Sequence, residues 1–400
     1  MAANKIKIFV DAHSFDKEFQ GAQTFIRELY NRLINDHPEL DIYIGARDTA
    51  NIHKLFPKLP WQNILQYKNR GVNILRFVFD IPAFIKKYRF DFAHFQYISP
   101  RKVAGCRYIV TMHDMLFNDF REDFPLLFSI PRNYLFGRSL LKADIKTTVS
   151  DYSKTRICDY YEIPGSEVHI ISNGVSNSLL QYQASKQEAV DLIEQKFGIK
   201  NFILYTSRIE PRKNQLLLLK KYLKLKLYEQ GIGLVFIGKE SIKTPGLRQL
   251  IANLTPEQQQ FFLWIKQAEQ QDLAAFYHAC RLFVYPSKAE GFGIPPLEAA
   301  ICGAPVLSSH TTAMQSFGFF KPHTFNPADE SFFEQKLLQM ALYPPTATFT
   351  SWVAEQVAQQ YNWQNSSTLF YNLLKVNYKQ HETEHSDIRH ARNPELLWRV

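Results

Sequence analysis

The sequence predicts an α/β protein with two doubly wound parallel-sheet domains facing a cleft. The chain has 400 residues, more than one hydrophobic core usually organises. Short apolar runs alternate with helical stretches, which is typical of parallel sheets with crossover helices, and the alternation occurs in two separate series. The hydrophobic content of 46% and the aromatic content of 14% are ample for two such cores.

The first series defines the N-terminal lobe. A helix capped by Ser150 or Asp151 is expected at residues 150–161. A further strand at 168–171 should lead into the hinge. The five earlier strands are expected at residues 7–10, 41–44, 92–95, 108–112 and 145–149.

The second series follows a connector with a helix expected at 187–197. Its strands are expected at residues 202–205, 234–237, 262–264, 282–285 and 305–307. Two terminal helices should occupy 351–361 and 362–379, and the charged, His-rich stretch 380–393 should be loose or only weakly docked. We therefore expect an N-terminal domain at 1–172, a C-terminal domain at 173–362, and a crossover helix with a tail at 363–400.

Two carboxylates, Glu290 and Glu298, stand eight positions apart around a glycine turn that opens a helix. Gly291 and Gly293 allow a tight turn that brings backbone N–H groups close to a ligand. Pro295 and Pro296 are tolerated in a first helical turn, and a helix N-terminus favours a diphosphate. Two glutamates at this spacing are often only solvated, but such a loop does not need the flanking glycines, prolines and strands.

This unit resembles the paired-glutamate signature of retaining glycosyltransferases of family 4. The resemblance implies the GT-B fold, with two Rossmann-like domains and C-terminal helices that cross back to the N-terminal domain. It also implies that Glu298 holds the nucleotide ribose and that Glu290 contacts the donor sugar. Gly291, Phe292 and Gly293 are implied to be donor-binding residues.

A second motif, Thr206-Ser-Arg-Ile-Glu-Pro-Arg-Lys-Asn214, follows an expected strand. Ligands in open parallel sheets bind beyond the carboxyl ends of the strands, so its cations are well placed. By resemblance to the family, Arg208 and Lys213 neutralise the donor diphosphate and stabilise the charge that develops as it leaves. Arg212 is expected to be exposed.

Two motifs of the N-terminal lobe extend the resemblance. His113 leaves the strand of Val110-Thr-Met-His-Asp114, and the family pattern implies that it approaches the donor sugar and the reacting centre. Gly21 opens a helix after the first strand, where a family glycine approaches the diphosphate; the doubled glycine of some relatives is Gly-Ala in this chain. Asn173-Gly174 matches a further family element that could be only a turn.

The net charge of +9 is concentrated in one segment. Residues 51–110 hold 11 Lys and Arg against 2 Asp and Glu, a difference of +9. Such a patch attracts phosphates or an anionic membrane surface. Within it, the large apolar side chains of residues 74–88 either lie at a bilayer interface or face the core, with the cations serving solubility. We expect a lipid-linked or anionic glycan acceptor, peripheral membrane contact and no nucleic acid.

The cellular location is predicted from the lack of a membrane-spanning run and of a signal segment. No apolar run approaches the roughly 18 residues that a membrane span needs, and no signal segment opens the chain. The protein is expected in the cytoplasm, at the inner face of the membrane. Cys106, Cys158, Cys280 and Cys302 lack metal-ligand spacing and are expected to be reduced thiols in or near the core.

We therefore expect a hexosyltransferase that retains anomeric configuration and serves surface polysaccharide or glycolipid assembly; the retention is implied by the resemblance. No Asp-x-Asp element follows a strand at the edge of either lobe, so no metal is expected. No cofactor is expected either, because the nucleoside diphosphate sugar is a substrate, with GDP-mannose as the working guess. The family suggests front-face departure of the diphosphate, whose oxygen helps deprotonate the acceptor.

Two other functions are compatible with a two-lobed fold of this kind. A nucleotide-sugar epimerase with the same fold would need additional acid and base carboxylates, and none is identified. A non-catalytic membrane or nucleic-acid adaptor could use the basic patch, but it would leave the paired glutamates and the diphosphate loop unexplained. Nucleotide-sugar binding discriminates the adaptor from the enzymes.

Overall fold

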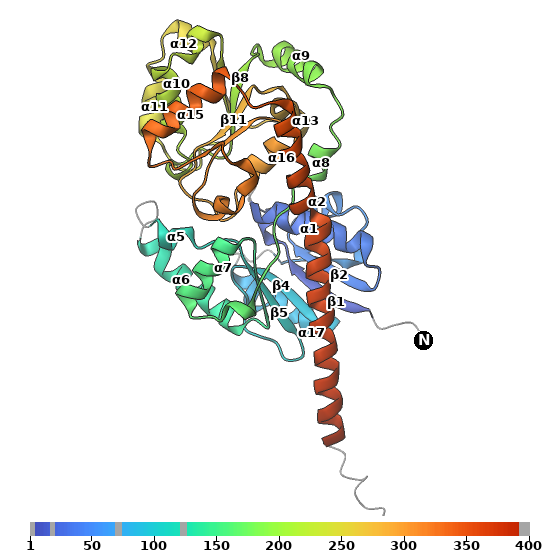
Figure 1. Cartoon of the computed structure of the whole chain (residues 1–400). Helices are drawn as coiled ribbons and strands as arrows, with labels where there is room; N and C mark the ends of the chain where they lie inside the picture. The colour runs from blue at the N-terminus through green and yellow to red at the C-terminus, as the bar shows by residue number, and fades with distance from the viewer. Residues whose placement is uncertain (1–4, 17–20, 69–73, 121–125, 392–400) are drawn as a thin grey trace, which may run out of the picture.

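The computed structural model describes residues 5–16, 21–68, 74–120 and 126–391. Figure 1 shows two α/β lobes, one above the other, with a long C-terminal helix running down one side. Each lobe has its own parallel sheet, and the two sheets have seven and six strands among the described residues. The predicted fold class is confirmed.

The N-terminal sheet has the order β3-β2-β1-β4-β5-β6-β7, and its neighbouring strands pair in parallel. Because β1 lies beside both β2 and β4, the strand order reverses between β1 and β4. This reversal is a topological switch point, where ligands of open α/β sheets bind. The strands are β1 (Ile6–Asp11), β2 (Leu40–Ala46), β3 (Ile64–Gln66), β4 (Phe92–Gln96), β5 (Arg107–Met112), β6 (Ile145–Thr148) and β7 (Val168–Ile170).

The helices of this lobe cover both faces of its sheet. In α1 (Gly21–Asp36) the buried side chains, among them Phe25, Ile26, Leu29 and Leu33, repeat at helical spacing and form one apolar face. Ser150 caps α7 by accepting a hydrogen bond from Ser153 N, as predicted. The other helices are α2 (Thr49–Leu55), α3 (Leu75–Val78), α4 (Asp80–Tyr88), α5 (Leu116–Asp119), α6 (Leu126–Lys142) and α7 (Asp151–Tyr161).

The C-terminal sheet has the order β10-β9-β8-β11-β12-β13. Its strands are β8 (Phe202–Thr206), β9 (Gly233–Ile237), β10 (Phe262–Ile265), β11 (Leu282–Tyr285), β12 (Val306–Ser309) and β13 (Thr324–Phe325). Its helices are α8 (Asn177–Leu180), α9 (Lys186–Phe197), α10 (Gln215–Lys224), α11 (Pro245–Ala252), α12 (Pro256–Gln260), α13 (Gln270–Ala279), α14 (Ile294–Ile301), α15 (Glu330–Leu342) and α16 (Ala347–Gln360).

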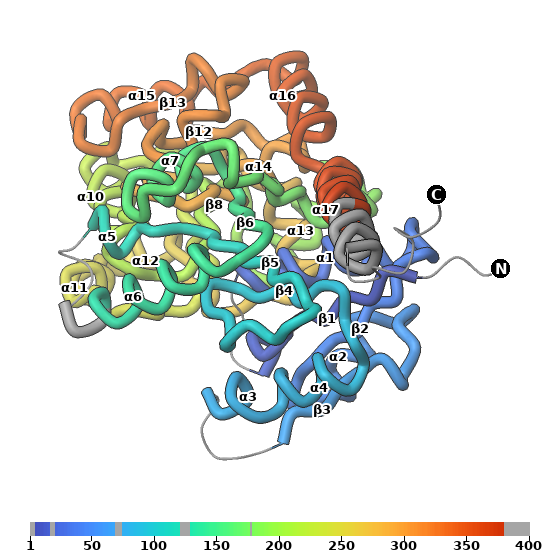
Figure 2. The backbone as a smooth tube through the Cα atoms, turned by 90° about the horizontal axis from the view of Figure 1, so that it is seen from below, coloured from blue at the N-terminus to red at the C-terminus, as the bar shows by residue number. Residues whose placement is uncertain are grey.

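The last helix, α17 (Trp363–Ala391), returns to the N-terminal lobe and lies alongside α1 in both views (Figures 1 and 2). Trp363 is fully buried and its ring contacts that of Phe25 at 5.9 Å between centroids. Phe370 stacks on His94 of β4 at 5.3 Å. These aromatic contacts join the crossing helix to the core of the N-terminal lobe.

The expected end of the last helix at residue 379 is wrong, because α17 continues to Ala391. Once a helix has formed, each added residue costs little, and the stretch contains neither Gly nor Pro before Pro394. Residues 392 and 393 lie outside the described part of the chain. The helix end extends beyond the body of the molecule in Figure 1.

The segment at 74–88 was expected either to lie at a bilayer interface or to face the core, and the structure buries one part of it and exposes the other. Ile81 and Ile85 of α4 are buried in the core, whereas Ile74, Val78 and Phe79 are about half exposed or more. Part of the apolar segment therefore serves packing, and part lies at the surface. Among the described residues, no helix is both long enough and apolar enough to cross a membrane.

The four cysteines are free thiols. Cys106, Cys280 and Cys302 are buried, and Cys158 is partly buried. Burial raises the pKa of the Cys280 thiol to about 12, so this thiol stays protonated at neutral pH. The predicted placement in or near the core is confirmed.

Candidate functional site

The glycine turn between β11 and α14 has the predicted shape. Gly293 has φ 96°, a left-handed conformation that glycine adopts without strain, and it directly precedes α14. Proline occupies the first turn of the helix, where a missing N–H costs nothing. The turn thus presents a helix N-terminus at the carboxyl edge of the C-terminal sheet.

Glu290 is buried at the start of this turn and is held by a cation and a phenol. Lys213 Nζ lies 2.6 Å from Glu290 Oε1 and 2.8 Å from Oε2, and Tyr285 Oη donates to Oε1 at 2.9 Å. Burial raises the pKa of the Glu290 carboxyl, but the charges of Lys213 and Arg212 lower it more, to about 2. The carboxylate is therefore ionised at neutral pH.

Arg212 belongs to this site, so the expectation that it is exposed is wrong. Its side chain is only 11% exposed, with Nη2 2.6 Å from Glu210 Oε1 and Nη1 3.5 Å from Glu290 Oε2. Nη1 also donates to Ala289 O. Two carboxylates and a carbonyl compensate the buried guanidinium, which explains why it turns inward.

Arg208 behaves differently from its neighbours in the same loop. Its side chain is exposed, and its backbone carbonyl is fixed by Gln215 Nε2 at 2.8 Å. Burial raises the pKa of Tyr97 in the opposite lobe, and the positive charge of Arg208 opposes that rise. Arg208 is thus an exposed cation on the side that faces the N-terminal lobe.

Glu298 is the fifth residue of α14, in a different environment from Glu290. Tyr277 Oη donates to Glu298 Oε2 at 2.9 Å, and Tyr277 is bound in turn to Thr206 Oγ1 at 2.7 Å. Burial raises the pKa of Glu298, and no cation offsets it among the causes of the shift. The structure therefore gives the two glutamates separate partners and opposite pKa shifts.

His113 leaves β5 and is held by a buried polar chain. Its Nε2 lies 2.6 Å from Gln96 Oε1, and Gln96 Nε2 lies 3.2 Å from His94 Nε2. Burial lowers the pKa of His113 to about 4, so the ring is neutral at pH 7. Because a carbonyl oxygen only accepts, Nε2 of the neutral ring carries the proton and Nδ1 is left as an acceptor.

The two lobes touch at Gly291. A β-carbon on Gly291 would lie 2.6 Å from Asp114 Cβ and 3.0 Å from His113 O, so only glycine fits. Ser150 Oγ and Ser153 Oγ both donate to Gly291 O, at 2.6 and 3.2 Å. Gly291 therefore brings the glutamate turn directly against the strand exit that carries His113.

Gly21 and Phe292 complete the predicted set. Gly21 is the first residue of α1, and a β-carbon there would have no atom of the described residues within 4 Å. Phe292 is buried against Phe317 and Tyr361, at 5.9 and 5.7 Å between ring centroids. The structure thus gives Phe292 a packing position, and none of the described residues crowds Gly21.

Several residues of the site were missed in the sequence, namely Gln96, Thr206, Tyr277, Tyr285 and Thr312. Gln96, Thr206 and Tyr285 each end a strand on the carboxyl edge, which is a usable signal. Tyr277 and Thr312 carry no such signal. Thr312 accepts a hydrogen bond from Glu290 N at 2.8 Å through its side chain, a contact between distant loops.

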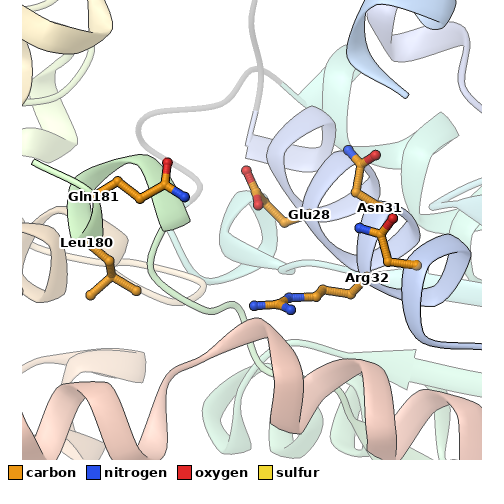
Figure 3. Close-up of a pocket in the computed structure, with 6 residues that line it drawn as sticks. Glu28, Asn31, Arg32, Leu180 and Gln181 are labelled. Carbon is orange, nitrogen blue, oxygen red and sulfur yellow. The ribbon is translucent and has the colours of Figure 1, made fainter. Parts of the chain in front are cut away.

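A separate cavity of about 380 Å³ opens between α1 and α8 (Figure 3). None of the predicted site residues lines it. Side chains from the two elements face each other across the space, and most of them are polar. The lining residues are Glu28, Asn31, Arg32, Asn35, Leu180 and Gln181.

Comparison with known proteins agrees with this geometry. The profile described as Glycosyltransferase Family 4 matches residues 19–179, and the profile described as Glycosyl transferases group 1 matches residues 187–316. The chain belongs to glycosyltransferase family 4. This family-4 chain is 25% identical over 389 residues to the O-antigen chain mannosyltransferase B of Escherichia coli, covering 93% of this chain and 100% of that protein.

Solved structures confirm the fold of the family-4 chain. Sucrose-phosphate synthase from Thermosynechococcus elongatus superimposes with a TM-score of 0.73 at 16% identity, covering 94% of this chain and 100% of that one. Anabaena Alr3699/HepE in complex with UDP-glucose superimposes with a TM-score of 0.71 at 16% sequence identity. The match covers 92% of this chain and 99% of that one. The fold is GT-B, and the family-4 chain is a hexosyltransferase.

Proposed function

We propose that the chain transfers a hexose from a nucleoside diphosphate sugar to a hydroxyl of a glycan acceptor, with retention of anomeric configuration. The observation that carries the proposal is the group of three cations around the glycine turn. Lys213 and Arg212 lie against Glu290, and Arg208 is exposed toward the other lobe. A diphosphate at the N-terminus of α14 would meet both these charges and unpaired backbone N–H groups.

The proposed reaction has one bond broken and one bond formed. The bond between the anomeric carbon and the diphosphate oxygen breaks, and the acceptor hydroxyl oxygen bonds to the same carbon. The hydroxyl proton goes to the departing phosphate oxygen. Arg208 and Lys213 stabilise the charge on the diphosphate, and Glu290 hydrogen-bonds the donor sugar. Neutral His113 presents Nδ1 as an acceptor to the same sugar.

Each glutamate has its own task in this proposal. Glu298 binds the ribose, whose hydroxyls donate to its carboxylate, and the Tyr277 contact holds the side chain in place. Glu290 exchanges part of its interaction with Lys213 for the sugar when the donor enters. The cations take the place of a divalent metal at the diphosphate, so neither metal nor cofactor is required.

The donor and acceptor are proposed from the relatives. The O-antigen mannosyltransferase likeness favours GDP-mannose as the donor and a lipid-linked glycan as the acceptor. Exposed Ile74, Val78 and Phe79, with exposed Lys86 and Lys87 on the next helix, support peripheral contact with an anionic membrane. Surface polysaccharide or glycolipid assembly at the cytoplasmic face is the corresponding process.

A nucleotide-sugar panel tests the proposal. Thermal shift in EDTA should single out one nucleotide sugar, which at 100 times its Kd adds roughly 2.7 kcal/mol to stability. The same sugar should then be transferred to a lipid-linked glycan in EDTA. Failure of every nucleotide sugar to bind, or activity that returns only when magnesium or manganese is added, would refute the proposed site.

A further inference from the structure

A second polar cluster lies at the carboxyl end of β1, outside the site already described. Asp11 is 1% exposed and is contacted from three directions. Tyr67 Oη donates to its Oδ1 at 2.8 Å, and Arg76 Nη2 donates to its Oδ2 at 3.1 Å. His13 Nδ1 lies 3.1 Å from the same Oδ2. The donor and acceptor roles assigned above use none of these four residues.

The partners of Asp11 fix its charge and the orientation of His13. Burial raises the pKa of the Asp11 carboxyl, but His13 and Arg76 lower it more, so the pKa lies well below its usual range. An ionised carboxylate only accepts hydrogen bonds, so His13 Nδ1 must carry a proton. Whenever the imidazole carries a single proton, that proton is on Nδ1 and Nε2 is an unprotonated acceptor.

His13 is the accessible member of the cluster. Its side chain is 21% exposed, against 8% for Arg76 and 1% for Asp11. Within the described part of the chain, no hydrogen bond or ion pair involves His13 Nε2. The cluster thus holds one imidazole in a single tautomer and leaves its acceptor nitrogen for a ligand.

The sheet topology puts His13 at the same carboxyl edge as the proposed reaction centre. Val10 of β1 pairs with His94 of β4, and β1 ends at Asp11, so His13 follows directly on the carboxyl end of β1 beside β4. Neighbouring strands lie about 4.8 Å apart. Tyr97 contacts His113, with 5.4 Å between ring centroids, and it responds to the charge of Arg208. His13 therefore lies at the β1–β4 switch point, on the acceptor side.

A purely structural role explains less of the cluster. A clamp between β1 and α3 needs Asp11, Tyr67 and Arg76, which are all buried, but not a partly exposed imidazole. Buried ion pairs also contribute little net stability, because desolvation offsets the attraction. If the buried residues serve to orient His13, this explains both why the imidazole is partly exposed and why the buried ion pair is present.

We propose that His13 accepts a hydrogen bond from a hydroxyl of the sugar acceptor and that Asp11 is the positioning residue that holds its tautomer. The inference rests on the proposed function and adds to it a binding residue for the acceptor. The ligand class is a neutral, hydroxyl-bearing part of a glycan, since an unprotonated nitrogen beside a carboxylate disfavours an anion.

The test measures initial rates with the acceptor and the donor varied separately. His13→Ala should lower kcat/KM for the acceptor roughly tenfold, the worth of one hydrogen bond. Donor KM at saturating acceptor and nucleotide affinity should not change. Asp11→Asn should weaken acceptor use similarly, and the double variant should be no worse than His13→Ala, because both act through one contact. His53→Gln, an exposed histidine of the same lobe, is the matched control.

Two results would overturn the inference. One is an unchanged acceptor kcat/KM in His13→Ala. The other is a parallel loss of donor affinity, acceptor use and melting temperature, which indicates a structural clamp. Failure of the proposed function is distinguishable, because the wild-type protein would then transfer no sugar at all.

Discussion

Glu290 and Glu298 are eight positions apart in the sequence, but their surroundings give them different chemistry. Glu290 is paired with Lys213 and its pKa falls to about 2, whereas burial raises the pKa of Glu298, whose partner is the phenol Tyr277. In the proposed donor complex, one carboxylate is held by a cation that the diphosphate would also attract. The other has no cation among the causes of its pKa shift and would suit a neutral ribose.

Substitution of each glutamate should therefore affect a different quantity. Glu298→Ala should raise the Kd for the free nucleotide, since a charged hydrogen bond is worth roughly 1.5 to 3 kcal/mol. Glu290→Gln should lower kcat by a similar factor with less effect on nucleotide affinity. Isothermal titration and steady-state kinetics measure the two effects. Glu355→Gln, on the exposed face of α16, is the control. Wild-type binding and turnover in both variants would show that the assignment is wrong.

His113 gives a prediction for the pH dependence of stability. Its pKa is about 4 in the folded protein against 6.5 for the unperturbed side chain, so the folded state binds fewer protons between these values. The contribution of neutral, buried His113 to the stability of the fold is therefore complete above pH 6.5. It is lost progressively as the pH falls from 6.5 through 4. The stability difference between wild type and His113→Asn should shrink by about 3 kcal/mol across this range. Urea denaturation at several pH values measures it, and a constant difference would contradict the burial of a neutral His113.

Much of the site can be predicted from single residues and their neighbours in sequence, and the rest depends on distant contacts. The strand, glycine turn and helix around Glu290 follow from local apolar runs, glycines and prolines. The inward turn of Arg212 does not, because its partners Glu290 and Ala289 lie far along the chain. The contact of Thr312 with Glu290 and the Gln96–His113 bond are missed for the same reason.

Among the elements, long apolar strands are predictable and short ones are not. The structure confirms every strand expected from an apolar run, with ends that differ by a few residues. It adds β3 and β13, which have only three and two residues and lie at sheet edges. Strands of two or three residues are too short to show the alternation of side chains that identifies a strand in the sequence. The length of α17 was also missed, because its polar end resembles a disordered tail in composition. The exact domain boundaries stay a prediction.

The crossing of the chain into α17 depends on a close backbone contact. A β-carbon on Gly174 would lie 2.6 Å from Trp363 N and 2.7 Å from Asn362 C, and backbone atoms yield little. Gly174→Ala should therefore destabilise the protein by roughly 1 to 3 kcal/mol. In Gly165→Ala, the matched control, the nearest atom is Lys154 Cε at 3.8 Å, so the change should stay within about 0.5 kcal/mol. Denaturant midpoints compare the two, and equal midpoints would refute the packing argument.

The molecule as a whole is two lobes joined by α17 and by the contact of Gly291 with Ser150 and Ser153. The basic excess of residues 51–110 belongs to the N-terminal lobe. One of its cations, Arg76, is buried against Asp11 and is not available to an outside partner. Exposed Lys86 and Lys87 of α4 remain, and exposed Ile74, Val78 and Phe79 lie in α3 or directly next to it in the chain.

Vesicle sedimentation tests the proposed membrane contact. Binding to anionic vesicles should exceed binding to neutral ones and should weaken as salt rises, since each exposed Lys or Arg near the surface adds roughly 1 kcal/mol. Val78→Ser should reduce binding without loss of nucleotide affinity. Leu141→Ser, an exposed apolar residue of α6, serves as the comparison. Equal sedimentation with neutral and anionic vesicles, or none with either, would favour an acceptor without a membrane anchor.

The central claim is that the cations and Glu290 support hexosyl transfer with the diphosphate leaving from the face that the acceptor attacks. The most direct measurement is the anomeric configuration of the first transfer product by NMR, with the donor that the panel identifies and EDTA present. The account predicts the same configuration in product and donor. An inverted product, or release of free sugar without transfer to the acceptor, would contradict it.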